Sequence, residues 1–116
     1  KEVLALAIHN LYFDTDKSDI AKSSYSYLNK LAELLVKQDD WKVRLTGHAD
    51  SRATAEYNIA LSKRRSEAVM FFLQNRGVKR KQLIVEYYGE EAPAATNASE
   101  GGRQLNRRVE MEFIFE

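Results

Sequence analysis

Residues 45–73, LTGHADSRATAEYNIALSKRRSEAVMFFL, predict the end of a strand, a polar loop and a long helix. At 3.6 residues per turn, one face of that helix carries Arg65 in the middle of an apolar arc, with Asn58 beside it. The apolar members of the arc are Leu61, Ala68, Val69 and Phe72. A guanidinium on a packed face is costly unless an anion meets it. We therefore expect Arg65 to have a carboxylate partner, supplied by the protein or by a ligand.

Asp50 is the protein carboxylate best placed to meet Arg65, because it follows the strand and lies in a loop that can turn toward the helix. Glu56 and Glu67 lie on the helix itself but project from its other side. Two hypotheses stay open. In one, Arg65 and Asp50 form a structural salt bridge. In the other, they bind the separate halves of one ligand that has both an ammonium and a carboxylate.

The composition favours one domain, residues 1–116, since 44% of the side chains are apolar, enough for a real core. The 18 basic and 17 acidic residues nearly balance, which argues against nucleic acid as a partner. The absence of cysteine excludes disulfides and thiolate metal sites. No apolar run approaches the roughly 20 residues that span a bilayer. Because the chain opens on Lys1 with no signal segment, we expect it to be the C-terminal part of a longer protein.

The rest of the chain alternates strand and helix patterns around the central stretch. We expect strands over residues 7–13, 41–47, 83–88 and 108–115, helices over residues 20–37 and 54–75, a turn over residues 14–19 and an irregular stretch over residues 89–103. Gly77 is expected to end the second helix in a left-handed conformation. The order β-α-β-α-β-(loop or short helix)-β predicts an α+β two-layer sandwich, with helices packed on one mixed sheet of about four strands.

Reactive side chains give no strong sign of catalysis or metal binding. His48 and Asp50 form an H-x-D pair at a strand end, but a metal needs three or four ligands, and the other histidine, His9, lies in the first strand. Ser51 and Ser62 lack the glycine pattern of a nucleophile elbow. We therefore predict no metal, no cofactor and local packing for His48.

Aromatic and basic residues near the strand ends leave two further alternatives open. Exposed aromatic rings there could stack bases, as in some RNA-binding sheets, although core or sheet-edge packing is more common. The residues concerned are Tyr12, Phe13, Tyr87 and Tyr88. Arg107 and Arg108 open the last strand, where one guanidinium can point inward over the sheet end and the other outward; ordinary surface charge is the alternative that stays open.

Four separated motifs occur in a familiar order. They are F-D-x-D-K at residues 13–17, G-H-A-D at residues 47–50, Y-N-x-x-L-S-x-x-R-x-x-x-V at residues 57–69 and N-R-R-V-E at residues 106–110. Together they make the chain, from about residue 8 to residue 115, resemble the OmpA-like peptidoglycan-binding domain. The similarity over residues 48–65 is closest to the peptidoglycan-associated lipoproteins of that family.

The resemblance implies non-covalent binding to the diaminopimelate of the peptidoglycan stem peptide. At the matching positions, Asp50 would meet the ammonium of diaminopimelate and Arg65 its carboxylate. It further implies that a loop with Phe13, Asp14 and Thr15 lines the cleft, that Asn58 and Leu61 join it from the helix, and that Arg108 shapes the far wall. Asn106 would hold the last loop in place. The implied protein is a non-enzymatic, periplasmic anchor attached to the outer membrane and cell wall, with no cofactor.

The chain departs from the family pattern at two positions, and one other function on the same polymer stays open. Many family members have alanine where this chain has Ser66, and glycine where it has Ala53. If that glycine takes a positive φ, alanine would strain or reshape the loop. The rival function is a peptidoglycan hydrolase or amidase, for which Asp14 and Asp50 would form a catalytic carboxylate pair.

Overall fold

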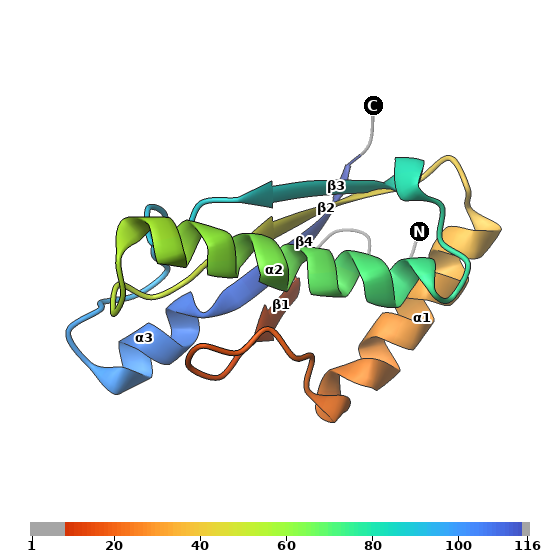
Figure 1. The fold of residues 1–116 in the computed structure, drawn as a ribbon. Coiled ribbons are helices and arrows are strands. Elements are labelled where there is room, and N and C mark those ends of the chain that lie inside the picture. The colour runs from red at the N-terminus through yellow and green to blue at the C-terminus, as the bar shows by residue number, and fades with distance from the viewer. Residues whose placement is uncertain (1–8, 115–116) are drawn as a thin grey trace.

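Four strands form one mixed sheet in the computed structural model, which describes residues 9–114 (Figure 1). The spatial order is β1-β4-β2-β3, so β1 and β3 are the edges. The strands are β1 (His9–Tyr12), β2 (Lys42–Gly47), β3 (Leu83–Tyr87) and β4 (Arg108–Ile114). β2 and β3 run parallel, while β4 is antiparallel to both β1 and β2. The carboxyl end of β2 therefore meets the first residues of β4, and the candidate site lies there.

Two long helices, α1 (Tyr25–Lys37) and α2 (Ala55–Gln74), pack on one face of this sheet (Figure 1). Both present apolar stripes to the strands, as their 3.6-residue periods predict. The core that they enclose includes Leu28, Leu31, Leu35, Val43, Leu45, Val69, Leu73, Val109 and Met111. The predicted α+β two-layer sandwich on one mixed sheet is thus confirmed.

Helix α2 has the ends that its sequence predicts. Thr54 caps its N-terminus, because the hydroxyl oxygen accepts a hydrogen bond from the Tyr57 amide at 3.1 Å. Beyond its C-terminus, Gly77 takes the left-handed conformation with φ of +100°.

Gly47 allows α2 to lie unusually close to the sheet. A Cβ atom at this position would stand 2.0 Å from the Ser62 carbonyl oxygen and 2.5 Å from the Ser66 hydroxyl. Ser66 itself is fully buried and donates to the Glu86 carbonyl oxygen at 2.9 Å, so serine is accommodated at this position. The close contact fixes the height of α2, and with it the position of Arg65, over the end of β2.

The start of the first helix differs from expectation, and the expected loop or short helix is a short helix. The first helix begins at Tyr25 rather than at residue 20, after a single 3₁₀ turn at Lys22–Ser24. Its two serines favour capping and turn conformations over helix interiors, which explains the late start. The irregular stretch ends in a short helix, α3 (Glu100–Asn106), which begins inside it. The strand expectations for residues 7, 8 and 115 lie outside the described residues.

Helix α3 forms although its first turn contains two glycines. The Ser99 hydroxyl accepts a hydrogen bond from the Gly102 amide at 3.1 Å, and Gly102 packs so tightly that a Cβ atom would stand 2.0 Å from the Thr96 carbonyl oxygen. At its other end, the buried Asn106 side chain binds the backbone of Ala94 and Ala95. This confirms the expectation that Asn106 holds the last loop.

Within residues 9–114, none of the helices combines the length and apolar character needed to cross a membrane.

Candidate functional site

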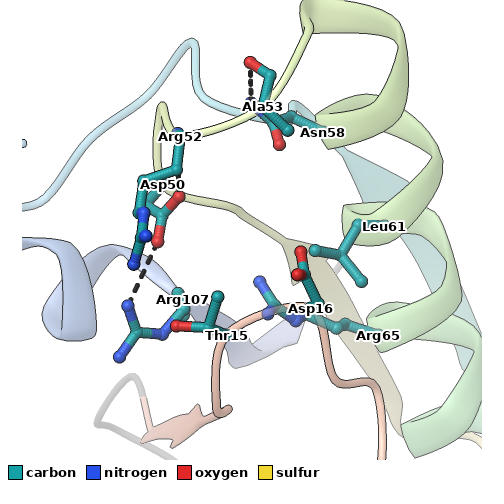
Figure 2. Close-up of a pocket in the computed structure, with 9 residues that line it drawn as sticks. All are labelled: Thr15, Asp16, Asp50, Arg52, Ala53, Asn58, Leu61, Arg65 and Arg107. Atoms are coloured by element: carbon teal, nitrogen blue, oxygen red, sulfur yellow. Dashed lines mark hydrogen bonds and ion pairs between the residues drawn. The ribbon is translucent and has the colours of Figure 1, made fainter.

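A cavity of about 150 Å³ opens where β2 ends (Figure 2). Its walls come from the loop after β1, the loop between β2 and α2, the first turns of α2 and the residue before β4. The lining residues are Thr15, Asp16, Asp50, Arg52, Ala53, Asn58, Leu61, Arg65 and Arg107. Segments far apart in the sequence thus supply one polar, partly enclosed site.

Arg65 is fully buried at the inner wall of this cavity. Its guanidinium donates three hydrogen bonds to backbone carbonyl oxygens: Nε to Lys17 at 2.8 Å, Nη1 to His48 at 3.0 Å and Nη2 to Asp14 at 3.0 Å. The ring of Phe13 lies 5.3 Å from the guanidinium carbon. Of the two hypotheses left open by the sequence, the structural salt bridge between Arg65 and Asp50 is therefore wrong, and within residues 9–114 Arg65 pairs with no protein carboxylate. Neutral carbonyl dipoles solvate the cation instead.

The electrostatics of Arg65 follow from this arrangement. The pKa of its guanidinium is lowered to about 10, first by burial and then by the nearby positive charge of Arg107, while Asp50 and Asp16 act in the opposite direction. Arg65 is still protonated at neutral pH. A guanidinium has five N–H donors, so two remain beyond the three used here. The site therefore has a buried cation with unused donors and no ion-pair partner among residues 9–114.

Asp50 lies across the cavity and has two partners of its own (Figure 2). Its Oδ1 accepts from the Arg52 amide at 3.0 Å, and its Oδ2 accepts from Arg107 Nη1 at 3.1 Å. Only 8% of the Asp50 side chain is exposed. The two contacts fix the orientation of the carboxylate, and the ion pair with Arg107 is the salt bridge that Arg65 does not make.

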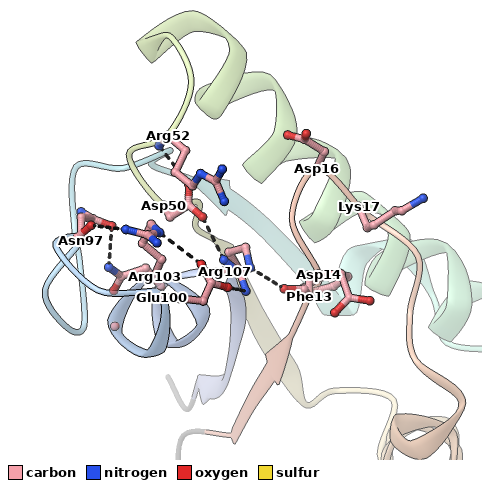
Figure 3. A network of polar contacts seen from close by, with 12 residues as sticks. Phe13, Asp14, Asp16, Lys17, Asp50, Arg52, Asn97, Glu100, Arg103 and Arg107 are labelled. Carbon is pink, nitrogen blue, oxygen red and sulfur yellow. Dashed lines mark hydrogen bonds and ion pairs between the residues drawn. The ribbon is translucent and has the colours of Figure 1, made fainter.

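Arg107 is one of four cavity-lining residues that the sequence-based prediction of the site did not include; the others are Asp16, Arg52 and Ala53. Arg107 is buried, donates from Nε to the Phe13 carbonyl oxygen at 2.9 Å, and pairs through Nη2 with Glu100 at 2.9 Å (Figure 3). Burial alone would lower the pKa of Arg107, but the hydrogen bonds with Glu100 and Asp50 outweigh burial and raise it. The sequence feature that could have identified Arg107 is the two-residue period of β4. Extended back by one residue, this period places Arg107 on the same face as the buried Val109.

Arg108 does not reach the cavity, contrary to the expectation that it shapes the far wall. Its side chain is buried elsewhere, where Nη2 donates to the Ala92 carbonyl oxygen at 3.0 Å and Nε to Glu110 at 2.9 Å. Arg107 is the arginine that points into the cavity, whereas Arg108 is buried and does not point outward to solvent as expected. Successive strand residues point to opposite faces of the sheet. The Arg108 side chain therefore lies on the same face as Glu110 and on the opposite face from Val109.

The other predicted site residues divide into two groups. Thr15, Asn58 and Leu61 line the cavity. Phe13 is buried beneath Arg65, and Asp14 contributes its carbonyl oxygen to Arg65 but is itself among the residues that line a different cavity. Asp14 and Asp50 therefore do not face one another across one cleft, as the hydrolase alternative requires.

The polar support of Asn58 links the helix to two loops. Its Nδ2 donates to the Ala53 carbonyl oxygen at 3.2 Å and to Glu90 Oε1 at 2.7 Å. Ala53 causes no backbone strain, because Asp16, with φ of 60°, is the one residue other than glycine that has a positive φ within residues 9–114. The alanine at this position is thus compatible with an ordinary loop conformation.

His48 is buried below the site and packs locally, as expected. Its carbonyl oxygen accepts from Arg65, while its ring lies against the other face of the sheet end, with Nε2 3.7 Å from Glu110 Oε1. The pKa of the imidazole is lowered to about 4, first by burial and then by the positive charge of Arg108, against the opposing effect of Glu110. Over the described part of the chain, no group of three or more histidine or acidic side chains could hold a metal.

The four strand-end aromatic residues occupy core and sheet-edge positions. Phe13 is 4% exposed and belongs to the core. Tyr12 and Tyr87 lie on the two edge strands, and Tyr88 follows β3, with exposures of 39–44%. The set does not form one continuous stacking surface, because edge strands β1 and β3 are separated by β4 and β2.

Comparison with known proteins gives a clear family assignment. The model of the OmpA family matches residues 12–107, which contain every residue that lines the cavity. The chain belongs to the OmpA family. The fold agrees, since this OmpA-family chain superposes on the peptidoglycan-associated lipoprotein from Burkholderia pseudomallei with a TM-score of 0.88. The two are 30% identical, and the match covers 90% of this chain and 89% of that structure.

Two curated relatives extend the comparison. The OmpA-family chain is 40% identical over 111 residues to the peptidoglycan-associated lipoprotein of Pseudomonas aeruginosa, covering 96% of this chain and 66% of the relative. It is also 40% identical over 98 residues to outer membrane porin F of Pseudomonas fluorescens, covering 84% of this chain and 30% of the relative. The chain thus spans just under two thirds of the length of the first relative and a smaller share of the second.

Proposed function

We propose that this OmpA-family domain binds peptidoglycan non-covalently through the diaminopimelate of the stem peptide. The observation that carries the proposal is the state of Arg65: a buried cation whose three protein partners are neutral carbonyls and whose two remaining N–H donors are unused. A buried charge of this kind is best neutralised by a ligand anion. A carboxylate suits a guanidinium, because it can accept two parallel hydrogen bonds.

The free end of diaminopimelate has an ammonium and a carboxylate on one carbon. In the proposed complex, the carboxylate binds Arg65 and the ammonium binds Asp50 across the cavity. The volume is suitable, since about 150 Å³ equals the space of roughly five water molecules and the group to be bound has five non-hydrogen atoms. Each charge-assisted hydrogen bond in such a partly dehydrated site contributes on the order of 1.5–3 kcal/mol.

The names of the relatives support the coarser part of the proposal. One relative is a peptidoglycan-associated lipoprotein and the other an outer membrane porin. We accordingly propose that the domain anchors an outer-membrane or periplasmic protein to the cell wall and works in the periplasm as a binding module without enzymatic activity. The proposal for the whole protein depends on these relatives, because the chain spans only part of their length.

The test is a titration with two soluble stem peptides that differ at the third residue, which is either diaminopimelate or lysine. The lysine peptide lacks the second carboxylate, so it should bind at least about tenfold more weakly if Arg65 reads that group. Equal affinity for the two peptides would remove the role assigned to Arg65.

A second assay separates binding from hydrolysis. Purified sacculi should sediment the protein while the supernatant gains no soluble peptide or sugar fragments. Release of fragments would instead favour the hydrolase or amidase. If RNA displaces the protein from the sacculi and the diaminopimelate peptide does not, the result would favour an RNA-binding sheet.

A further inference from the structure

The charged residues that line the cavity do not by themselves suit an ammonium ion. Arg52, Arg65 and Arg107 stand against Asp16 and Asp50, so three positive and two negative charges leave a net charge of +1. The one buried acid among them, Asp50, already forms an ion pair with Arg107 at 3.1 Å. An Asp50–Arg107 pair alone is neutral and would attract a cation only weakly.

A carboxylate outside the cavity changes this balance. Glu100 lies in the first turn of α3 and does not line the cavity, yet its Oε2 accepts from Arg107 Nη2 at 2.9 Å (Figure 3). Arg107, with 6% of its side chain exposed, is thereby held between two carboxylates. Asp50, Arg107 and Glu100 together have a net charge of −1, and Arg103, which pairs with the other oxygen of Glu100 at 3.2 Å, brings this group to zero. Without Glu100 the same group would have a net charge of +1.

We infer that Glu100, acting through Arg107, sets the charge that Asp50 presents to the ammonium of a zwitterionic ligand. The inference rests on the proposed function and assigns a specificity role to α3, which does not touch the ligand cavity. Glu100 is a positioning residue in this scheme: it engages one end of the Arg107 guanidinium, so that Asp50 keeps negative charge for the ligand.

The surroundings of Glu100 keep it in place and ionised. The hydrogen bond from Arg107 is the first cause of its lowered pKa, so it is ionised at neutral pH. Its other oxygen accepts from Arg103 Nε at 3.2 Å, and Arg103 Nη1 is bound in turn to the Asn97 carbonyl oxygen at 3.0 Å. Arg103 does not line the cavity, so it orients Glu100 without replacing Arg107 beside Asp50.

The alternative is that Glu100 only fastens α3 to the start of β4. Two ligands distinguish the two roles. The first is the soluble diaminopimelate tripeptide; the second is the same peptide with the side-chain ammonium replaced by hydrogen, which keeps the carboxylate for Arg65. A purely structural defect would weaken both peptides equally, whereas a charge effect would weaken only the first.

The experiment compares the 116-residue chain with Glu100→Gln, which removes the charge at nearly constant size. Binding is measured by calorimetry at low salt, where screening is weak. Because Glu100 is largely exposed, we expect Glu100→Gln to reduce the preference for the ammonium-bearing peptide by about threefold. Glu100→Asp should restore the preference, and Glu33→Gln, an exposed change on α1, should leave it unaltered.

Each outcome has a distinct meaning. A loss of preference in Glu100→Gln with rescue by Glu100→Asp supports the inference. An unchanged preference, or equal weakening of both peptides, overturns it and leaves the proposed function standing. If the unmodified chain binds neither peptide, the proposed function itself fails, and the inference fails with it.

Discussion

Arg107 Nη1 lies 3.1 Å from Asp50 Oδ2, so the conspicuous acid of this site is held by an arginine other than the one on the helix. The two buried guanidinium groups therefore have different partners and different roles. Arg107 is engaged by carboxylates and orients the acid, whereas Arg65 is engaged by carbonyl oxygens alone and keeps its full charge for a ligand. Four predictions follow from this and from the packing around it.

Replacing Arg65 by lysine should damage both binding and folding. Lysine keeps the charge but cannot serve three carbonyl oxygens and a ligand carboxylate at once. We expect diaminopimelate-peptide affinity to fall at least about 30-fold, and the free energy of unfolding to fall by about 2–4 kcal/mol, because buried carbonyls lose their partners. Calorimetric titration and urea denaturation measure the two effects. The exposed neighbour provides the control, since Arg64→Lys should change neither quantity appreciably.

Asp50→Asn tests the acid without removing its shape. The asparagine can still accept from the Arg52 amide, but it has no charge for the ligand ammonium. We expect the affinity for the diaminopimelate peptide to drop by at least about 2 kcal/mol, because truncating one member of a buried charged contact costs about 2–5 kcal/mol. The exposed change Asp40→Asn serves as control. If the Asp50→Asn variant binds the peptide with wild-type affinity, Asp50 does not contact the ligand.

Gly47→Ala should be severely destabilising although it adds one methyl group. The new Cβ would stand 2.0 Å from the Ser62 carbonyl oxygen, a backbone atom that moves only if α2 moves. We expect a loss of about 3 kcal/mol or more in the free energy of unfolding, or no folded protein. Gly101→Ala is the matched control. A Cβ atom there meets nothing within 4 Å, so alanine in α3 should be neutral or stabilise by up to about 1 kcal/mol. Equal melting temperatures for the two variants would contradict the close packing of α2.

Stability should decline as the pH falls from about 6.5 to 4. The pKa of His48 is lowered to about 4 in the folded state, so over this interval the unfolded chain binds more protons than the native one. The stability contributed by neutral His48 is complete above the unfolded pKa and is lost toward the folded pKa, by up to about 3 kcal/mol. Urea denaturation at a series of pH values measures the loss.

His48→Gln provides the control for this pH dependence. His9 also has its pKa lowered by burial and acts in the same direction, so the variant should retain a weaker slope rather than none. If His48→Gln keeps the full wild-type slope between pH 6.5 and 4, the buried imidazole is not its source.

The burial of Arg65 and the element order could be predicted from sequence, because helical and strand periods assign side chains to faces before the fold is known. The partners of Arg65 could not be predicted in this way. They are the carbonyl oxygens of Asp14, Lys17 and His48, and every residue has a carbonyl oxygen, so no side-chain pattern marks these three. Only the closing of two loops around the helix brings them to one point.

Arg107 is a different case, since the information was present in the sequence. Counting in steps of two from the buried Val109 places Arg107, not Arg108, on the face that the helices cover. The family resemblance directed attention to the motif as a whole and not to the alternation within it. Asp16 lines the cavity in a left-handed backbone conformation, and its place there depends on the turn geometry that precedes α1.

The position of the three carbonyl oxygens that bind Arg65 has a mechanical consequence. Within residues 9–114, β1 is an edge strand paired with β4, and two of the three carbonyl oxygens that bind Arg65, those of Asp14 and Lys17, belong to the loop after β1. Any tension that enters the domain along β1 therefore passes within a few residues of the proposed ligand contact. If the domain binds peptidoglycan as proposed, force applied along β1 would therefore reach the residues that hold Arg65 in place.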